Sequence, residues 1–241
     1  MEKTSMEKTD AVWKNLYTVG GVAPLITLIF YLSEFSLAIF GEAYPATAEG
    51  WFSLFQRSKL LGLWYLNALD IISIAFMGVM FLALYMTLRR GNESVMAIAA
   101  FFSLTGVTVF VATRSELVAA SLALSDRYAA AATEAQRAPI VAAWQAVSAI
   151  GQPTPQTTGF LLMTVAVLII SAVMLRGTIF GKATAWVGIL AGIVTILDDV
   201  CVVLVPSIAI PLMGLCGILW IVWWILISIR LFRLGRLEMK S

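Results

Sequence analysis

Six ionisable residues stand inside apolar stretches that are long enough to cross a lipid bilayer. Asp198 and Asp199 are adjacent in the apolar run 188–206. The other four are Glu34, Asp70, Arg114 and Glu116. Charges at such depth are costly and are kept where another group pairs with them, protonates them or binds them. Clustered carboxyls can hold a proton, bind a cation or, as an acid and base pair, support catalysis.

Composition narrows the chemistry that these residues can perform. The chain of 241 residues has no histidine, which removes the commonest general base and a common metal ligand. Its two cysteines, Cys201 and Cys216, lie outside any Cys-x-x-Cys motif, and we interpret them as small core residues. No phosphate-binding glycine loop and no Gly-x-Ser-x-Gly motif occurs. We therefore predict no cofactor, no metal site and no catalytic residue.

The chain has the composition of a polytopic membrane protein. It is 61% hydrophobic and 12% charged, whereas soluble domains are about 45–50% apolar and about 25% charged. A net charge of +2 and the lack of a basic, aromatic-rich patch argue against a nucleic-acid partner. We predict an all-α bundle of six transmembrane helices in a domain 19–232, between an N-terminal segment 1–18 and a basic tail 233–241. The predicted spans are 19–40, 60–88, 94–124, 159–175, 185–205 and 208–231.

Lysine and arginine are divided unequally between the two sides of this topology. With the N-terminus inside, eleven of the sixteen lie in inner segments, four lie in outer segments, and Arg114 lies within a span. By the positive-inside rule, both termini are predicted to be cytoplasmic. All six buried ionisable residues then fall in the outer half of the bundle, because they come late in outward spans or, for Asp70, early in an inward span.

Helical spacing predicts which of these side chains face the interior. Asn67 shares a helix face with Asp70, so it joins the predicted site. Asp199 shares a face with three small residues, and small residues on one face permit close helix packing. These residues are Gly188, Gly192 and Thr195. We therefore predict that Asp199 points into the bundle, with Asp198 about 100° around the helix.

The predicted ligand or ion site holds more acids than it can neutralise by itself. Its members are Glu34, Asn67, Asp70, Arg114, Glu116, Asp198 and Asp199. Five carboxyls face one arginine, and isolated ions cost several kcal/mol each in a medium of low dielectric. Protons, water or a bound cation must share the site. An alternative is a structural clamp, in which Arg114 bridges two carboxylates and the other acids reach water.

Two longer connections carry apolar residues of their own. In segment 41–59, we predict that Trp51 and Phe52 lie in the lipid headgroup region. In segment 125–157, apolar residues at helical spacing predict an amphipathic helical segment on the outer membrane surface. These residues are Ile140, Trp144, Val147 and Ile150.

Short fragments in a fixed order are spread over nearly the whole chain. They are Gly20-Gly21 followed by Glu34, Leu66-Asn67-Ala68-Leu69-Asp70, Leu84-Tyr85 before Arg89-Arg90, Gly188 to Gly192, Leu197-Asp198, Pro206, and Leu219-Trp220 before Trp223. This order resembles an uncharacterised prokaryotic integral-membrane family, known as domain of unknown function 4386. The resemblance implies a six-helix bundle in a bacterial or archaeal plasma membrane and implies no activity. It matches neither Arg114 nor Asp199, whose predicted roles rest on the residues alone.

The cluster favours the binding or transport of a small cation, a proton or a cationic amphiphile, in a protein whose other partner is the lipid bilayer. A rival hypothesis is a structural or accessory subunit that contacts a membrane-protein partner through the apolar span 159–175 and a tryptophan surface. That surface would consist of Trp220, Trp223 and Trp224. An enzyme that acts on lipids is a third hypothesis.

Overall fold

The computed structural model describes residues 2–151 and 158–237, and this part of the chain is built from helices and short turns. The helices are α1 (Glu2–Phe40), α2 (Ala48–Arg57), α3 (Lys59–Tyr65), α4 (Asp70–Leu88), α5 (Glu93–Ala130), α6 (Glu134–Gly151), α7 (Thr158–Arg176), α8 (Lys182–Leu204) and α9 (Pro206–Leu237). Six of them, namely α1, α4, α5, α7, α8 and α9, contain segments long and apolar enough to cross a membrane. The prediction of an all-α protein with six such helices is confirmed.

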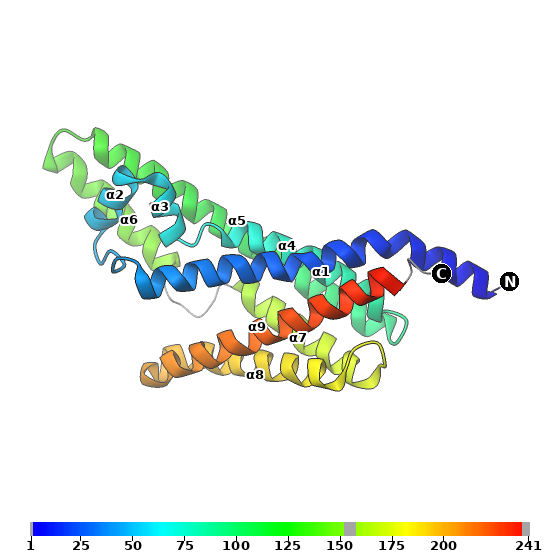
Figure 1. Cartoon of the computed structure of the whole chain (residues 1–241). Helices are drawn as coiled ribbons and strands as arrows, with labels where there is room; N and C mark the ends of the chain where they lie inside the picture. Colours follow the sequence, from blue (N-terminus) through cyan, green and yellow to red (C-terminus); the bar gives the residue numbers. More distant parts are fainter. Residues whose placement is uncertain (1, 152–157, 238–241) are drawn as a thin grey trace.

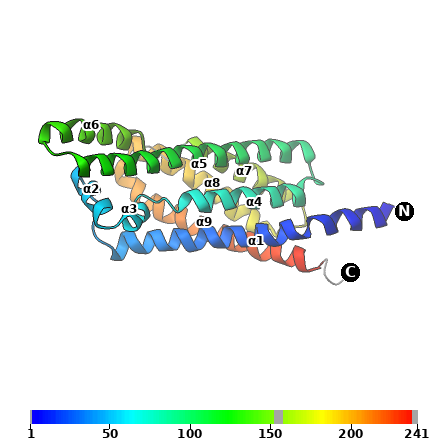
Figure 2. The ribbon, with the colours of Figure 1, turned by 90° about the horizontal axis from the view of Figure 1, so that it is seen from above.

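The six long helices form a ring in chain order (Figure 1). Each one packs against the helix before it and the helix after it, and α9 closes the ring by packing against α1. Successive helices run in opposite directions, so the start of α1 and the end of α9 lie at one end of the bundle, which we call the termini end (Figure 2). The turns of the opposite end carry α2, α3 and α6.

Close backbone contact joins the two halves of the ring at α5 and α7. A Cβ atom added to Gly159 would lie 2.5 Å from the carbonyl oxygen of Gly106, and a Cβ atom added to Gly106 would lie 2.5 Å from the carbonyl oxygen of Gly159. Lipid is as apolar as a leucine side chain, so helices in a membrane associate largely through such tight packing. The buried core of the bundle includes Met77, Met80, Leu84, Met96, Met163, Trp223 and Ile227.

The second predicted span, 60–88, is divided between two helices in the structure. The chain forms α3 and then a turn at 66–69 before α4 begins at Asp70. Asn67 has a φ of 54°, in the left-handed region that asparagine tolerates better than most residues. The break places the side chains of Asn67 and Asp70 at the point where the chain enters the bundle.

The end opposite the termini carries a second hydrophobic core. We call α2, α3, α6 and residues 117–130 of α5 the cap. Helix α5 has 38 residues, or about 57 Å at ~1.5 Å per residue, which exceeds the ~30 Å hydrocarbon core of a bilayer. The helix is thus longer than a membrane span needs, and its last turns support α6, which runs back alongside them (Figures 1 and 2).

Aromatic side chains fill the cap core. The Trp144 ring centroid lies 5.8 Å from that of Trp51 and 5.5 Å from that of Phe52. Trp51 is 6% exposed and Phe52 is fully buried, so the prediction that they lie among lipid headgroups is wrong. The apolar face of α6, with Ile140 and Trp144, contacts this core instead of a lipid surface. Residues 152–157 and 238–241, and the side chain of Ile150, lie outside the described part of the chain.

Two ion pairs fasten the cap on its outside. Arg57 Nη2 donates to Glu42 Oε2 at 2.8 Å, and Lys59 Nζ lies 2.9 Å from Asp126 Oδ1. The hydrogen bond and positive charge of Arg57 lower the pKa of Glu42 below its ordinary value. All four side chains are more than half exposed, so these pairs orient the cap segments and contribute little to its stability.

Candidate functional site

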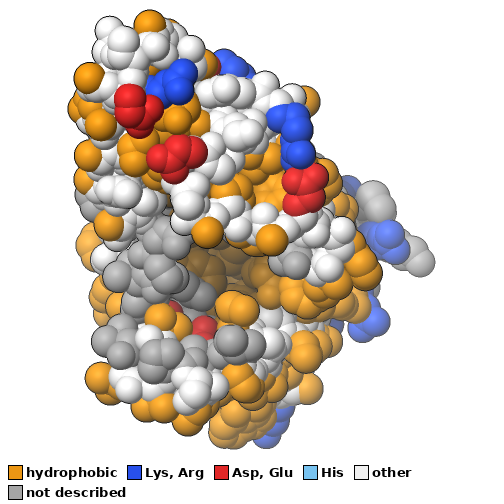
Figure 3. All heavy atoms as spheres, turned by 90° about the vertical axis from the view of Figure 1, so that its left-hand side faces the viewer, with side chains coloured by type: hydrophobic (Ala, Val, Ile, Leu, Met, Phe, Trp, Pro, Cys, Tyr) orange, Lys and Arg blue, Asp and Glu red, His pale blue; other side chains and the backbone are white. Residues whose placement is uncertain are grey.

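A cavity of about 340 Å³ lies between the six long helices, at the end that carries the cap. Every one of these helices contributes at least one side chain to its wall. Figure 3 looks onto this end and shows a hollow between the cap above and the α8–α9 part below, with hydrophobic side chains along its walls. A volume of this order suits a small organic molecule.

Three carboxyl groups from three helices face this cavity. They belong to Glu34 near the end of α1, Asp70 at the start of α4, and Asp198 in α8. Glu34 is 9% exposed and Asp198 is 5% exposed, so both are largely removed from solvent. Their convergence follows from the alternating helix directions, which bring the end of one span beside the start of the next.

Arg114 is the only cationic residue among those that line the cavity in the described part of the chain. Its Nη2 atom lies 4.0 Å from Asp70 Oδ2, at the limit of an ion pair. The guanidinium carbon also stands 5.4 Å from the ring centre of Phe110, one turn earlier on α5. One arginine against three carboxyls leaves the cavity with an excess of potential negative charge.

Several buried polar atoms at this cavity have no hydrogen-bond partner among the described residues. The acceptors are Glu34 Oε1, Asn67 Oδ1 and Asp198 Oδ1, and the donors are Arg114 Nε and Trp224 Nε1. A buried polar group without a partner costs about 1–3 kcal/mol. Native proteins contain few such groups, so a concentration of them in one cavity indicates a place where other molecules supply the partners.

Aromatic side chains form the apolar part of the wall. The ring centroid of Trp220 lies 5.8 Å from that of Trp224 and 5.8 Å from that of Phe160. Tyr31 meets Trp224 edge to face at 5.9 Å. The Trp220 indole is fixed from behind, because its Nε1 donates to Thr195 Oγ1 at 3.0 Å. The cavity thus has an acidic part and a rigid aromatic part.

The structure brings together five of the seven residues predicted for the site. Glu34, Asn67, Asp70, Arg114 and Asp198 line the cavity, whereas Glu116 and Asp199 do not. Residues two positions apart in the sequence lie about 200° apart around an α-helix. Glu116 therefore faces outward when Arg114 faces inward, and it is exposed.

Asp198, not Asp199, is the aspartate that faces the cavity. The glycine stripe used to orient α8 marks its contact with a neighbouring helix instead of the centre of the ring. A Cβ atom on Gly192 would clash with Leu168 of α7. Asp199 continues that stripe and is only partly buried, while Asp198 is buried and lines the cavity.

The aromatic wall is the part of the site that sequence reasoning missed. Trp220, Trp223 and Trp224 are 4%, 0% and 5% exposed, so they pack inside the bundle instead of forming an exposed surface. A usable signal exists, because Cys216, Trp220 and Trp224 follow each other at intervals of four and share one helix face. All three line the cavity.

The donor set does not resemble that of a metal site. Among the described residues, no three His, Cys, Asp or Glu side chains are grouped closely enough to hold a metal ion. The hydroxyl of Ser73, another lining residue, donates to the Asp70 backbone carbonyl at 3.2 Å. The arrangement is suited to holding a positively charged group beside an apolar body.

The ring of six apolar helices around a polar cavity defines a multi-pass integral membrane protein. The family model described as "Domain of unknown function (DUF4386)" matches residues 20–228, and the chain belongs to this family. The resemblance drawn from the ordered sequence fragments is thereby confirmed. Comparisons with curated proteins and with solved structures gave no match.

Proposed function

We propose that this protein binds an organic cation in the cavity. The observation that carries the proposal is the set of three buried acceptor atoms without partners, on Glu34, Asn67 and Asp198. A protonated amine supplies N–H donors and the positive charge that a wall with three carboxyls and one arginine lacks. Its hydrocarbon part would lie against Tyr31, Trp220 and Trp224, and an ammonium group over such faces gains cation–π attraction.

Size and composition favour an organic cation over a metal ion or a proton. A cavity of about 340 Å³ is much larger than a single ion, and drug-sized ligands fill pockets of ~300–1,000 Å³. Aromatic side chains make up much of its wall, and the rings of Phe110, Phe160, Trp220 and Trp224 offer no oxygen ligands to a metal. The proposal therefore narrows the hypotheses drawn from the sequence to a cation with an apolar body.

The helix break at the cavity supports transport as the role of this binding. Secondary transporters bind substrates beside interrupted helices, where freed backbone groups line a polar site. Here the α3–α4 break at Asn67 stands at the edge of the cavity. The same break would also let α3 and the cap move relative to α4.

We further infer that both termini are cytoplasmic and that the cap and the cavity face the outside of a prokaryotic plasma membrane. The support is the excess of lysine and arginine in the segments at the termini end. Residues 19–232 would then form a single transmembrane domain, with the segment 1–18 and the basic tail 233–241 inside.

A matched pair of variants tests the proposed site. Asp198→Asn and Asp199→Asn each remove one carboxylate from the same turn of α8, and only the first changes the cavity wall. The purified protein is heated with and without phenethylammonium, and phenethyl alcohol serves as the uncharged analogue. A ligand that binds only the folded state at 100 times its Kd adds about 2.7 kcal/mol of stability.

We expect phenethylammonium to raise the Tm of the wild type and of Asp199→Asn but not that of Asp198→Asn. Equal stabilisation by the alcohol would show that the charge is irrelevant. Equal stabilisation of the two variants would place the cation outside this cavity. Either result contradicts the proposed function.

A further inference from the structure

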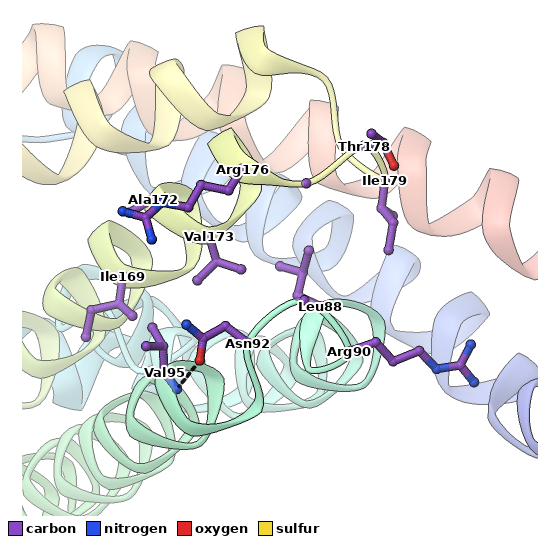
Figure 4. A pocket seen from close by; sticks show the side chains of 12 residues that line it. Leu88, Arg90, Asn92, Val95, Ile169, Ala172, Val173, Arg176, Thr178 and Ile179 are labelled. Atoms are coloured by element: carbon purple, nitrogen blue, oxygen red, sulfur yellow. Dashed lines mark hydrogen bonds between the residues drawn. The ribbon is translucent and has the colours of Figure 1, made fainter.

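A second and larger pocket lies at the termini end, between the α4–α5 turn and the α7–α8 turn (Figure 4). Its volume is about 630 Å³. Aliphatic side chains form the walls, among them Val95, Ile169 and Val173, and Arg176 stands at the rim. None of the described residues that line this pocket is acidic, in contrast to the cavity at the other end.

We propose that this pocket binds an anionic phospholipid, with the lipid phosphate at Arg176 and an acyl chain along α5. Pockets with basic residues between transmembrane helices are suited to anionic headgroups. The proposal concerns a different site and a different ligand class from the proposed function, and neither depends on the other.

The depth of the pocket agrees with a headgroup position. The pocket is built from the ends of α4 and α7 and the start of α5, so it lies where these helices leave the membrane. Trp186, in the first turns of α8, is 55% exposed. Exposed tryptophans near span ends typically mark the membrane–water interface. The phosphate of a lipid can therefore bind in the pocket while it stays in the headgroup region of the bilayer.

An apolar path for an acyl chain leads from the pocket toward the bilayer centre. Val95 belongs to the pocket wall, and Ile98 and Phe101 follow it at intervals of three on α5. Ile98 is 50% exposed and Phe101 is 65% exposed. At ~1.5 Å per residue, Phe101 lies about 9 Å deeper than Val95, and each three-residue step turns about 60° around the helix, so this exposed apolar surface winds around α5 toward the bilayer centre.

Arg176 is the group that we assign to the phosphate. It is the last residue of α7 and is exposed, and in Figure 4 its side chain extends over the wall beside Ala172. Arg90 also borders the pocket, but its guanidinium extends away from the other labelled side chains. An arginine guanidinium binds phosphate oxygens through two parallel hydrogen bonds, which a neutral side chain cannot replace.

The test compares lipid binding by the full-length protein and by three single variants in detergent. Native mass spectrometry measures the Kd for phosphatidylglycerol and for phosphatidylcholine, and inorganic phosphate is the headgroup control. We expect phosphatidylglycerol to bind more tightly than phosphatidylcholine and phosphate not to compete at similar concentrations. Arg176→Gln should raise the phosphatidylglycerol Kd about tenfold, the value of one charge-assisted hydrogen bond.

Two further variants separate the pocket from a general effect of charge. Arg233→Gln removes an exposed positive charge at the same end but outside the pocket, and its Kd should match the wild type. Ala172→Trp fills the pocket while Arg176 is retained, and it should weaken binding as Arg176→Gln does. The Tm of each lipid-free variant shows that the fold is kept, because all three positions are exposed.

Three results would overturn the proposal. Equal affinities for the two lipids would remove the role of charge. Equal losses in Arg176→Gln and Arg233→Gln would indicate unspecific attraction to the basic end. Competition by inorganic phosphate at the same concentration as the lipid would identify a phosphate site without a lipid chain.

Discussion

Arg114 Nη2 on α5 lies 4.0 Å from Asp70 Oδ2 at the start of α4, and this loose contact is the ion pair at the cavity. The two side chains are 19% and 26% exposed. Their separation leaves Asp70 open to a second cation, and Glu34 Oε1 and Asp198 Oδ1 have no hydrogen-bond partner in the described structure. Arg114 thus competes with any cationic ligand for Asp70. Its positive charge also reduces the net negative charge of the site.

Removal of Arg114 should increase the affinity for a cation. In Arg114→Gln, a ligand no longer experiences the repulsion of the guanidinium or its competition for Asp70. We expect the Kd for phenethylammonium to fall about fivefold, equivalent to ~1 kcal/mol for unit charges in a partly hydrated site. Isothermal titration calorimetry measures the change. Arg137→Gln is the control, because Arg137 stacks on Tyr128 in the cap, away from the cavity.

Thr195→Val should destabilise the protein more than its size suggests. Thr195 is fully buried, and its hydroxyl accepts the Trp220 indole N–H at 3.0 Å. Valine keeps the shape but leaves that N–H unpaired, at a cost of about 1–3 kcal/mol. Thr108→Val is the matched control, since the exposed Thr108 hydroxyl bonds the Leu104 carbonyl of its own helix. Equal Tm values for the two variants in thermal unfolding would argue against a role of Thr195 in holding Trp220.

Two glycine-to-alanine changes should have opposite signs. A Cβ atom at Gly159 would lie 2.5 Å from Gly106 O and 2.7 Å from Phe110 N, and these backbone atoms cannot move without separating α5 from α7. Gly159→Ala should therefore cost about 1–3 kcal/mol. Gly214 in α9 has no atom within 4 Å of the added carbon. Gly214→Ala should be neutral or gain about 0.5–1 kcal/mol. Unfolding in a mixed-detergent titration distinguishes the two signs.

The ion pair between Arg57 and Glu42 should stop stabilising the cap at low pH. The pKa of Glu42 is lowered from its ordinary value of 4.5 in the folded protein, mainly by the hydrogen bond from Arg57. A group with a lowered folded pKa stabilises the fold above its unfolded pKa, and this contribution disappears as the pH falls through the folded pKa. The rate of proteolysis of the cap should therefore be slightly higher for Glu42→Gln than for wild type at neutral pH and equal once the pH lies below the folded pKa of Glu42.

The partner of Glu42 provides the control for this pH effect. Arg57→Gln removes the same ion pair from the other side, so the double variant should be cleaved no faster than either single variant at neutral pH. A double variant with the summed effect of both single changes would mean that the two residues act separately.

The spans themselves were predictable because lipid imposes a local rule. Backbone polar groups in a membrane must be satisfied within the segment, so a sufficiently long apolar run has to be helical. The span predicted at 159–175 is α7, observed as Thr158–Arg176. The same rule does not apply outside the membrane, and there the prediction failed for Trp51 and Phe52, whose burial depends on contact with Trp144 of the distant α6.

The amino-acid sequence by itself determined the number of spanning helices, their alternating directions and the common level of Glu34, Asp70, Arg114 and Asp198. The tertiary structure decided which of these side chains meet. Asp198 and Asp199 differ by about 100° around α8, and the rotation of that helix is fixed by tertiary contacts such as that of Gly192 with Leu168 of α7 and that of Thr195 with Trp220 of α9. The aromatic wall likewise combines Tyr31 of α1, Phe160 of α7 and two tryptophans of α9, and these side chains meet only in the closed ring, which no local pattern encodes.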